Sequence, residues 1–264
     1  MDEFSHTFVV CAYKESPFLR DCLVSLTQQT LPARILMATS TPNDAIRSLA
    51  EEFGVPLFIS DKPSGIGRDW NFAVSCAETD FVTIAHQDDV YQPDYLKTLQ
   101  EYSRKAKDPL ILFTDYGELR NGAVITENKN LKIKRMINAL IKPKLFWHSK
   151  FMRNRALSIG NAICCPSVCL HRAAYPDFRF DESMACSLDW DAWNRLAQKK
   201  GSFVYVPEIL MLHRIHEDSE TTKQLEADGQ RFQEDYAIFQ RYWPTFIAKW
   251  LMKKYAKSAD SNQI

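Results

Sequence analysis

Two adjacent carboxylates, Asp88 and Asp89, follow an apolar segment at residues 81–85 that is typical of a buried strand. Neighbouring carboxylates repel each other and stay ionised easily only when a cation lies close by. Their oxygens suit Mg²⁺ or Mn²⁺, which proteins hold through one or two carboxylates together with substrate phosphates. The pair therefore predicts a metal and phosphate site. The alternative is that an aspartate caps the helix expected to begin near Pro93.

Polar groups also follow the other apolar segments that predict strands. After residues 7–12, 35–38 and 56–60 come, in turn, Tyr13, Lys14 and Glu15, then Thr39, Ser40 and Thr41, then Asp61 and Lys62. In open α/β sheets, ligands bind outside the carboxyl ends of the strands. We therefore expect these groups to converge with Asp88 and Asp89 on one edge of a sheet.

Strands and helices alternate from residue 7 to residue 116, which predicts an α/β protein with a mostly parallel sheet and helices on both faces. Beyond Asn121-Gly122, a hairpin-turn signal, the pattern loosens. The later segments predict an amphipathic helix at 187–198, short strands at 203–206 and 209–212, and helical structure from about residue 222 onward.

The composition is that of a folded protein with one large domain or two small ones. Of 264 residues, 45% are apolar and 25% are charged, which excludes disorder, collagen and coiled coil for the bulk of the chain. The 33 basic and 33 acidic residues cancel, so net charge excludes no class of partner. Seven cysteines without a CxxC pair, and no signal peptide, predict a reduced, cytosolic protein. No apolar run reaches the ~18 residues of a transmembrane helix.

Four segments resemble, in order, parts of family 2 glycosyltransferases with the GT-A fold: residues 9–30, 64–96, 178–197 and 213–221. They are similar to the family's first strand and nucleotide loop, its glycine and asparagine helix with the DxD-type motif, its catalytic carboxylate region and a late histidine loop. The resemblance implies a GT-A-like sheet and three regions. These are a nucleotide-sugar-binding half at 1–120, an acceptor-binding and catalytic half of the same domain at 121–221, and a C-terminal helical extension at 222–264.

The resemblance further implies inverting, metal-dependent transfer of a sugar from a nucleotide-sugar donor to a hydroxyl of a glycan or lipid-linked acceptor. Asp189 is the expected general base and Asp191 the second candidate. On a helix these two side chains lie about 200° apart, so only one faces the cleft. The alternative for Asp189 is that it caps the helix N-terminus. The expected ligands of Mn²⁺ or Mg²⁺ are Asp88, Asp89 and His216, and the expected contacts to acceptor or diphosphate are Trp190 and His213.

The expected donor-binding residues lie at strand ends or in the helix that starts near Gly65. They are Ala12, Tyr13, Glu15, Thr39, Lys62, Gly65, Arg68, Asn71, Gln87 and Asp88. A helix N-terminus favours anions, so Arg68 is expected to reach the diphosphate. The alternatives are that Tyr13 is a packing residue and that Arg68 lies on the surface.

Three positions depart from the family pattern. Residues 39–41 stand where an acidic residue commonly contacts the nucleobase, His86 replaces the first Asp of the DxD-type motif, and Leu188 reduces the acidic pair before the base. The first two departures motivate a second hypothesis, a non-catalytic sugar-nucleotide-binding protein that kept the fold. A nucleotidyltransferase and a nicotinamide-dependent oxidoreductase are disfavoured, because their glycine-rich signatures are absent after the first strand.

Two stretches combine cations with apolar residues. Residues 128–176 hold ten Lys or Arg and no Asp or Glu. Near the end, an apolar stripe at helical spacing lies among lysines and consists of Trp243, Phe246, Ile247, Trp250 and Leu251. We expect peripheral attachment to the inner face of the cell membrane, where a lipid-linked acceptor for lipopolysaccharide or capsule would be found. The alternatives are packing on the core and a grip on a substrate phosphate. Nucleic acid is disfavoured as a partner, since no binding module accompanies the charge.

Overall fold

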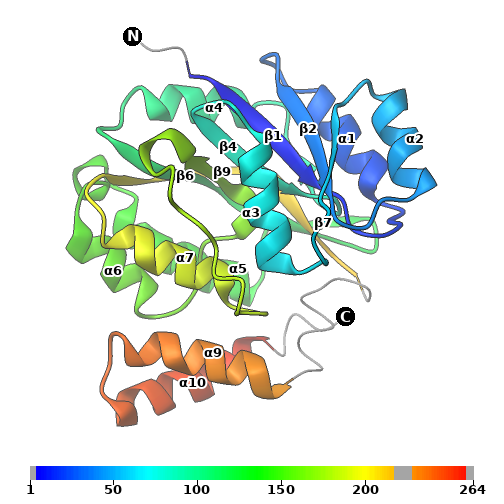
Figure 1. The fold of residues 1–264 in the computed structure, drawn as a ribbon. Coiled ribbons are helices and arrows are strands. Elements are labelled where there is room, and N and C mark those ends of the chain that lie inside the picture. Colours follow the sequence, from blue (N-terminus) through cyan, green and yellow to red (C-terminus); the bar gives the residue numbers. More distant parts are fainter. Residues whose placement is uncertain (1–3, 217–227, 260–264) are drawn as a thin grey trace.

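The computed structural model describes residues 4–216 and 228–259, which form one nine-stranded sheet flanked by helices (Figure 1). The strands are β1 His6–Cys11, β2 Arg34–Thr39, β3 Leu57–Ile59, β4 Phe81–His86, β5 Val90–Tyr91, β6 Pro109–Arg120, β7 Ala123–Ile125, β8 Val168–His171 and β9 Ser202–Ile215. Their order is β3-β2-β1-β4-β8-β6-β9-β5, with β7 paired to β6. Strands β1 to β4 are parallel, β8 lies antiparallel between β4 and β6, and β9 is parallel to β6. Most strands thus run in one direction, which confirms the predicted α/β sheet.

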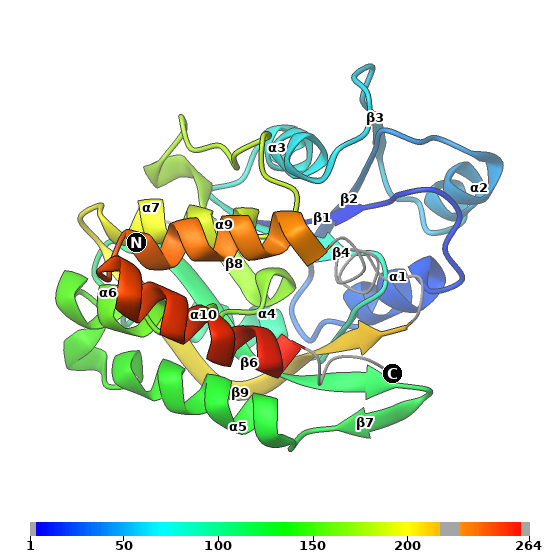
Figure 2. The same ribbon diagram turned by 90° about the horizontal axis from the view of Figure 1, so that it is seen from below.

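Helices cover both faces of this sheet (Figures 1 and 2). They are α1 Leu19–Thr27, α2 Asp44–Glu52, α3 Ile66–Cys76, α4 Tyr95–Ser103, α5 Lys129–Asn138, α6 Lys150–Leu157, α7 Leu188–Ala197, α9 Asp228–Gln240 and α10 Thr245–Ala259. Successive side chains of β1 point to opposite faces, so Val9 packs with α3 and α7 while Phe8 and Val10 pack with α1 and α4. Helices α9 and α10 join the first of these cores. Within the described ranges, no helix has the length and apolar content needed to cross a bilayer.

Local sequence signals correctly predicted one turn and one helix. Asn121 and Gly122 have φ angles of 49° and 80°, the left-handed values that a two-residue hairpin turn requires, and they join β6 to β7. The helix expected at 187–198 is α7, with Ser187 and Gln198 at its caps.

One expected pair of strands and one expected helix cap were wrong. The strands expected at 203–206 and 209–212 form one strand, β9, whose register against β6 shifts around Pro207. Proline has no N–H to donate, so a bulge lets the ladder continue past it. The helix expected near Pro93 is confirmed as α4, which begins at Tyr95 with Asp94 at its N-cap position. Neither Asp88 nor Asp89 caps α4, which leaves both carboxylates for other contacts.

Candidate active site

The carboxyl ends of β1 and β4 open onto a cleft of about 1190 Å³. The loops after β1 and β4, the start of α3, the start of α7 and the end of β9 line it, together with side chains from α5, α9 and α10. This is where ligands bind in open α/β sheets. The predicted site residues that line the cleft are Ala12, Tyr13, Glu15, Gly65, Gln87, Asp88, Asp89, Asp189, Trp190, His213 and His216.

Gln87 and Asp88 connect the end of β4 to the loop after β1. The amide of Gln87 exchanges two hydrogen bonds with the backbone of Tyr13, each 2.9 Å long. Oδ1 of Asp88 accepts a 3.0 Å hydrogen bond from Oγ of Ser16, and Oδ2 lies 3.4 Å from Nε2 of His216. The side chain of Asp88 is 25% exposed, so its carboxylate is accessible to a ligand in the cleft.

Asp89 is adjacent to Asp88 in sequence but is fully buried. Its Oδ1 accepts a 2.9 Å hydrogen bond from the backbone N–H of Arg214 and lies 3.0 Å from Nδ1 of His213. Burial alone would raise the pKa of Asp89, but the charge of His213 and these hydrogen bonds lower it. Burial alone would lower the pKa of His213, but the nearby carboxylate of Asp89 raises it by more, so the pKa is raised. The two residues therefore form a partly buried ion pair that fastens the end of β9 to the loop after β4.

The cleft brings two groups together at the end of β4 that could hold a divalent cation. These are the carboxylate of Asp88 and the imidazole of His216, both of which line the cleft. Across residues 4–216 and 228–259, no three His, Cys, Asp or Glu side chains are grouped so that they could hold a metal ion. The pair fits Mg²⁺ or Mn²⁺ when phosphate oxygens supply further ligands, as these ions commonly require. Of the three predicted ligands, Asp89 is instead engaged with His213 and the backbone of β9.

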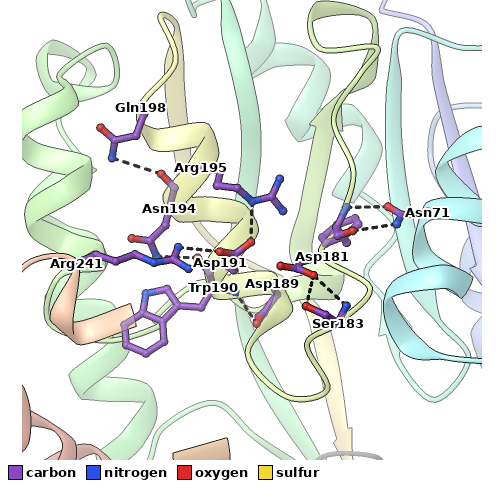
Figure 3. A network of polar contacts seen from close by, with 11 residues as sticks. Asn71, Asp181, Ser183, Asp189, Trp190, Asp191, Asn194, Arg195, Gln198 and Arg241 are labelled. Atoms are coloured by element: carbon purple, nitrogen blue, oxygen red, sulfur yellow. Dashed lines mark hydrogen bonds and ion pairs between the residues drawn. The ribbon is translucent and has the colours of Figure 1, made fainter. Parts of the chain in front are cut away.

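Asp189 lies in the first turn of α7 (Figure 3). It lines the same cleft as Asp88. Nδ2 of Asn161 donates a 2.7 Å hydrogen bond to its Oδ2, and the backbone N–H of Trp190 donates a 2.7 Å bond to its Oδ1. Burial raises the pKa of Asp189, and these hydrogen bonds offset the rise only in part. A carboxylate with a raised pKa takes up a proton more readily, which suits a general base.

Asp191, the second candidate base, and Trp190, an expected acceptor contact, are both engaged with other parts of the protein. Asp191 is buried outside the cleft lining and accepts 2.7 Å hydrogen bonds from Arg195 and Arg241 (Figure 3). The indole of Trp190 is 1% exposed, and its Nε1 donates to the backbone carbonyl of Leu157. The placement therefore does not support Asp191 as the second candidate base or the indole as an acceptor contact. The helical geometry that allows only one of the two aspartates into the cleft selects Asp189.

Helix α9 holds the segment that leads into α7. The carboxylate of Glu234 accepts three 2.9 Å hydrogen bonds from the consecutive N–H groups of residues 185–187. Oγ of Ser187 donates a 2.5 Å bond to Oδ1 of Asp235, which is also buried. Burial raises the pKa of Asp235 to about 6. The region expected to be only a C-terminal helical extension therefore includes a helix, α9, that supports the turn carrying Asp189.

Four predicted donor-binding residues are absent from the cleft lining: Thr39, Lys62, Arg68 and Asn71. Arg68 donates to the backbone carbonyls of residues 63 and 64, at 3.0 and 2.9 Å. Asn71 exchanges hydrogen bonds of 2.7 and 3.0 Å with the backbone of Phe180. Both side chains therefore brace loops near the cleft, and their placement does not support direct contact with a donor.

Several lining residues from distant elements were missed by sequence reasoning, among them Trp70, Tyr116, Glu118, Lys134, Asn161, Arg214, Arg231 and Tyr255. Lys134 donates a 2.7 Å hydrogen bond to the hydroxyl of Tyr116. Trp70 stacks on His86 with ring centroids 5.2 Å apart. The basic stretch at 128–176 was the only signal for Lys134, and no local pattern marks the others.

The glycosyl transferase family 2 model matches residues 7–175, more than half of the chain. The chain belongs to glycosyl transferase family 2. The resemblance seen in its motifs is thereby confirmed, and so is the expected enzyme class, a glycosyltransferase.

Similar proteins support the same family and the GT-A-like fold. An uncharacterized glycosyltransferase of Methanocaldococcus jannaschii is 24% identical over 226 residues, which cover 81% of this chain and 72% of that protein. S. aureus TarS 1-349 in complex with UDP-GlcNAc aligns over 97% of this chain and 72% of its own, with a TM-score of 0.67 and 14% identity. The mannosyltransferase PcManGT from Pyrobaculum calidifontis, in complex with GDP-Man and Mn²⁺, aligns over 97% and 73%, with a TM-score of 0.67 and 13% identity. This family 2 chain spans 41% of a longer TarS structure.

Proposed function

We propose that this glycosyltransferase moves a sugar from a nucleotide-sugar donor to an acceptor hydroxyl with inversion at the anomeric carbon. The proposal rests on one observation: a single cleft contains Asp88 beside His216 at the end of β4 and Asp189 at the start of α7. Inversion by single displacement requires one base and one site for the leaving diphosphate. TarS in complex with UDP-GlcNAc and PcManGT in complex with GDP-Man support a nucleotide sugar as the donor class.

The donor's diphosphate would bind next to Asp88 and His216, which would hold Mn²⁺ or Mg²⁺ with it. When bound, such an ion neutralises the charge that develops on the leaving diphosphate. The two hydrogen bonds from Gln87 to Tyr13 hold the loop after β1 in place, and this loop would contact the donor. Glu15 lines the cleft from the same loop.

The acceptor hydroxyl would be activated by Asp189. Its carboxylate takes the hydroxyl proton while the hydroxyl oxygen attacks the anomeric carbon and the bond from that carbon to the diphosphate oxygen breaks. The hydrogen bond from Asn161 orients the carboxylate, and its raised pKa increases its affinity for the proton. Residues 1–120 would then form the donor half of the domain and residues 121–221 the acceptor half.

The acceptor would be a glycan or a lipid-linked saccharide that is built into a surface polysaccharide such as lipopolysaccharide, at the inner face of the cell membrane. The basic and apolar character of residues 128–176 supports this setting. Lys134 of that stretch lines the cleft, where it adds positive charge near the site of phosphate binding.

A second candidate is a non-catalytic sugar-nucleotide-binding protein, favoured by the stacking of His86 on Trp70 where the family has an aspartate. Incubation with UDP-, GDP- and dTDP-sugars, with and without Mn²⁺, separates the two. Donor turnover that is lost with a chelator and in Asp189→Asn supports the glycosyltransferase. Metal-dependent donor binding without turnover of any donor supports the second candidate.

A further inference from the structure

The last helix, α10, has two different sides. One side packs on the core through Ala248 and Met252, which are buried, and through Leu251, which is partly buried. The other side carries Phe246 and Trp250, which are 74% and 58% exposed. Residues four apart lie on the same face of a helix, so these two rings are neighbours. The apolar stripe predicted from the sequence is therefore divided, and two large aromatic rings remain in solvent.

Lysines flank this exposed aromatic pair. Lys249 and Lys253 follow Phe246 and Trp250 by three residues each, and Lys254 lies beside them. All three lysines are exposed, and the sequence of α10 contains no Asp or Glu. Aromatic rings bordered by cations are typical of a helix that lies in the plane of an anionic bilayer surface. The charge of the helix therefore favours a negatively charged partner with an apolar layer.

Helix α5 repeats the pattern. Lys129, Lys132, Ile133 and Met136 follow the spacing i, i+3, i+4, i+7, and all four side chains are exposed. Seen from below, α5 and α10 lie on the same side of the molecule (Figure 2). Lys132 also pairs with Glu127 at 3.1 Å, so part of the positive charge of α5 is neutralised.

We infer that this side of the protein binds the surface of an anionic bilayer. The lysine–aromatic face consists of Phe246, Lys249, Trp250 and Lys253 of α10 with Lys129, Lys132, Ile133 and Met136 of α5. Its aromatic rings enter the headgroup layer while its lysines contact anionic headgroups. Helix α10 also contributes Tyr255 to the cleft lining, so the bilayer would lie next to the active site. The reason for this location rests on the proposed function, whereas lipid binding itself is measured without donor or acceptor.

Sedimentation of the full chain with vesicles tests this inference. We expect the protein to pellet with phosphatidylcholine vesicles that contain phosphatidylglycerol, to remain in the supernatant with phosphatidylcholine alone, and to dissociate at high salt. Each cation near an anionic leaflet contributes ~1 kcal/mol, about a fivefold change in partition, so Lys249→Gln with Lys253→Gln should weaken binding about thirtyfold. Phe246→Ser with Trp250→Ser should also weaken it. Phe58→Ser on β3 and Lys107→Gln change exposed residues outside this face and should bind like the wild type.

Three results would overturn the inference. The first is equal recovery in the supernatant with both vesicle types at low salt. The second is equal pelleting with neutral and anionic vesicles. The third is a dimer in analytical ultracentrifugation that Phe246→Ser with Trp250→Ser abolishes, without vesicle binding, which would make the face a contact between two copies. Vesicle binding without any sugar transfer would contradict the proposed function and support the lipid-binding face. Sugar transfer without vesicle binding would support the proposed function and contradict the lipid-binding face.

Discussion

Asn161 and Asp189 lie 28 residues apart in the chain, yet Nδ2 of Asn161 is 2.7 Å from Oδ2 of Asp189. This bond crosses from the loop after α6 to the first turn of α7. It orients one partly buried carboxylate in the cleft, whereas the nearby Asp191 pairs with two arginines. The two aspartates should therefore respond differently to the same substitution.

Asp189→Asn keeps the shape of the side chain and removes the proton acceptor. We expect the turnover number to fall by roughly 10²–10⁴, the usual contribution of a general base. Donor affinity should hardly change, because the base contacts the acceptor. Steady-state kinetics together with calorimetric donor titration measure both quantities. Asp191→Asn is the matched control and should lower the melting temperature more than the turnover number, since it weakens two ion pairs. The reverse pattern would contradict the assignment of Asp189.

Asp88 and Asp89 should give opposite results despite being neighbours. Asp88→Asn is expected to remove the dependence of donor binding on Mn²⁺ and to leave the melting temperature nearly unchanged, because Asp88 is partly exposed in the cleft. Asp89→Ala is expected to cost ~1–3 kcal/mol of unfolding free energy, since it removes a buried carboxylate and leaves the backbone N–H of Arg214 and the partly buried His213 without this acceptor.

Denaturant unfolding and donor titration with and without Mn²⁺ measure these effects. A stable Asp89→Ala protein that has lost only its metal response would show that Asp89 acts as a ligand. An Asp88→Asn protein with an unchanged metal response would place the metal elsewhere.

Glu234 is expected to act on catalysis through position alone. Glu234→Gln removes the charge that accepts three backbone N–H groups, so the turn before Asp189 should loosen. A misplacement of about 1 Å can cost 10²-fold, so we expect the turnover number to fall by roughly 10–10² at unchanged donor affinity. Glu101→Gln, on the exposed side of α4, is the control and should be silent. A loss of donor affinity equal to the loss of turnover would argue for general unfolding instead.

Asp235 should make stability depend on pH. Its pKa of about 6 in the folded protein exceeds the usual 3.8, so the unfolded chain releases this proton first as the pH rises. The free energy of unfolding should therefore fall between about pH 4 and pH 6, by roughly 3 kcal/mol at 1.36 kcal/mol per pKa unit, and remain low above that range. Asp235→Asn cannot ionise and keeps an acceptor for Ser187. In denaturant unfolding, the stability of Asp235→Asn relative to the wild type should rise between about pH 4 and pH 6. A stability difference that does not change with pH would contradict the raised pKa of Asp235.

Features that depend on local patterns could be predicted from the amino-acid sequence. The left-handed turn at Asn121 and Gly122, the start of α7 after Ser187 and the alternation of strands and helices up to β6 all follow from backbone preferences and from the spacing of apolar residues. The motifs around Asp88 and Asp189 also indicated the family before any geometry was known. Such signals act within a few residues, so they survive without knowledge of the neighbours in space.

Which of these residues share the cleft depends on contacts between elements that are far apart in the chain. Asp88 and Asp89 are chemically identical neighbours. Strand β9, more than a hundred residues away in the chain, packs over Asp89 and buries it, whereas Asp88 stays accessible in the cleft. In the same way, the contact of α9 with residues 185–187 and the packing side of α10 depend on surfaces that meet only after folding. The apolar residues of a helix cover a broad arc of its surface. Which part of that arc is buried depends on the surface it packs against, and the local sequence does not contain that information.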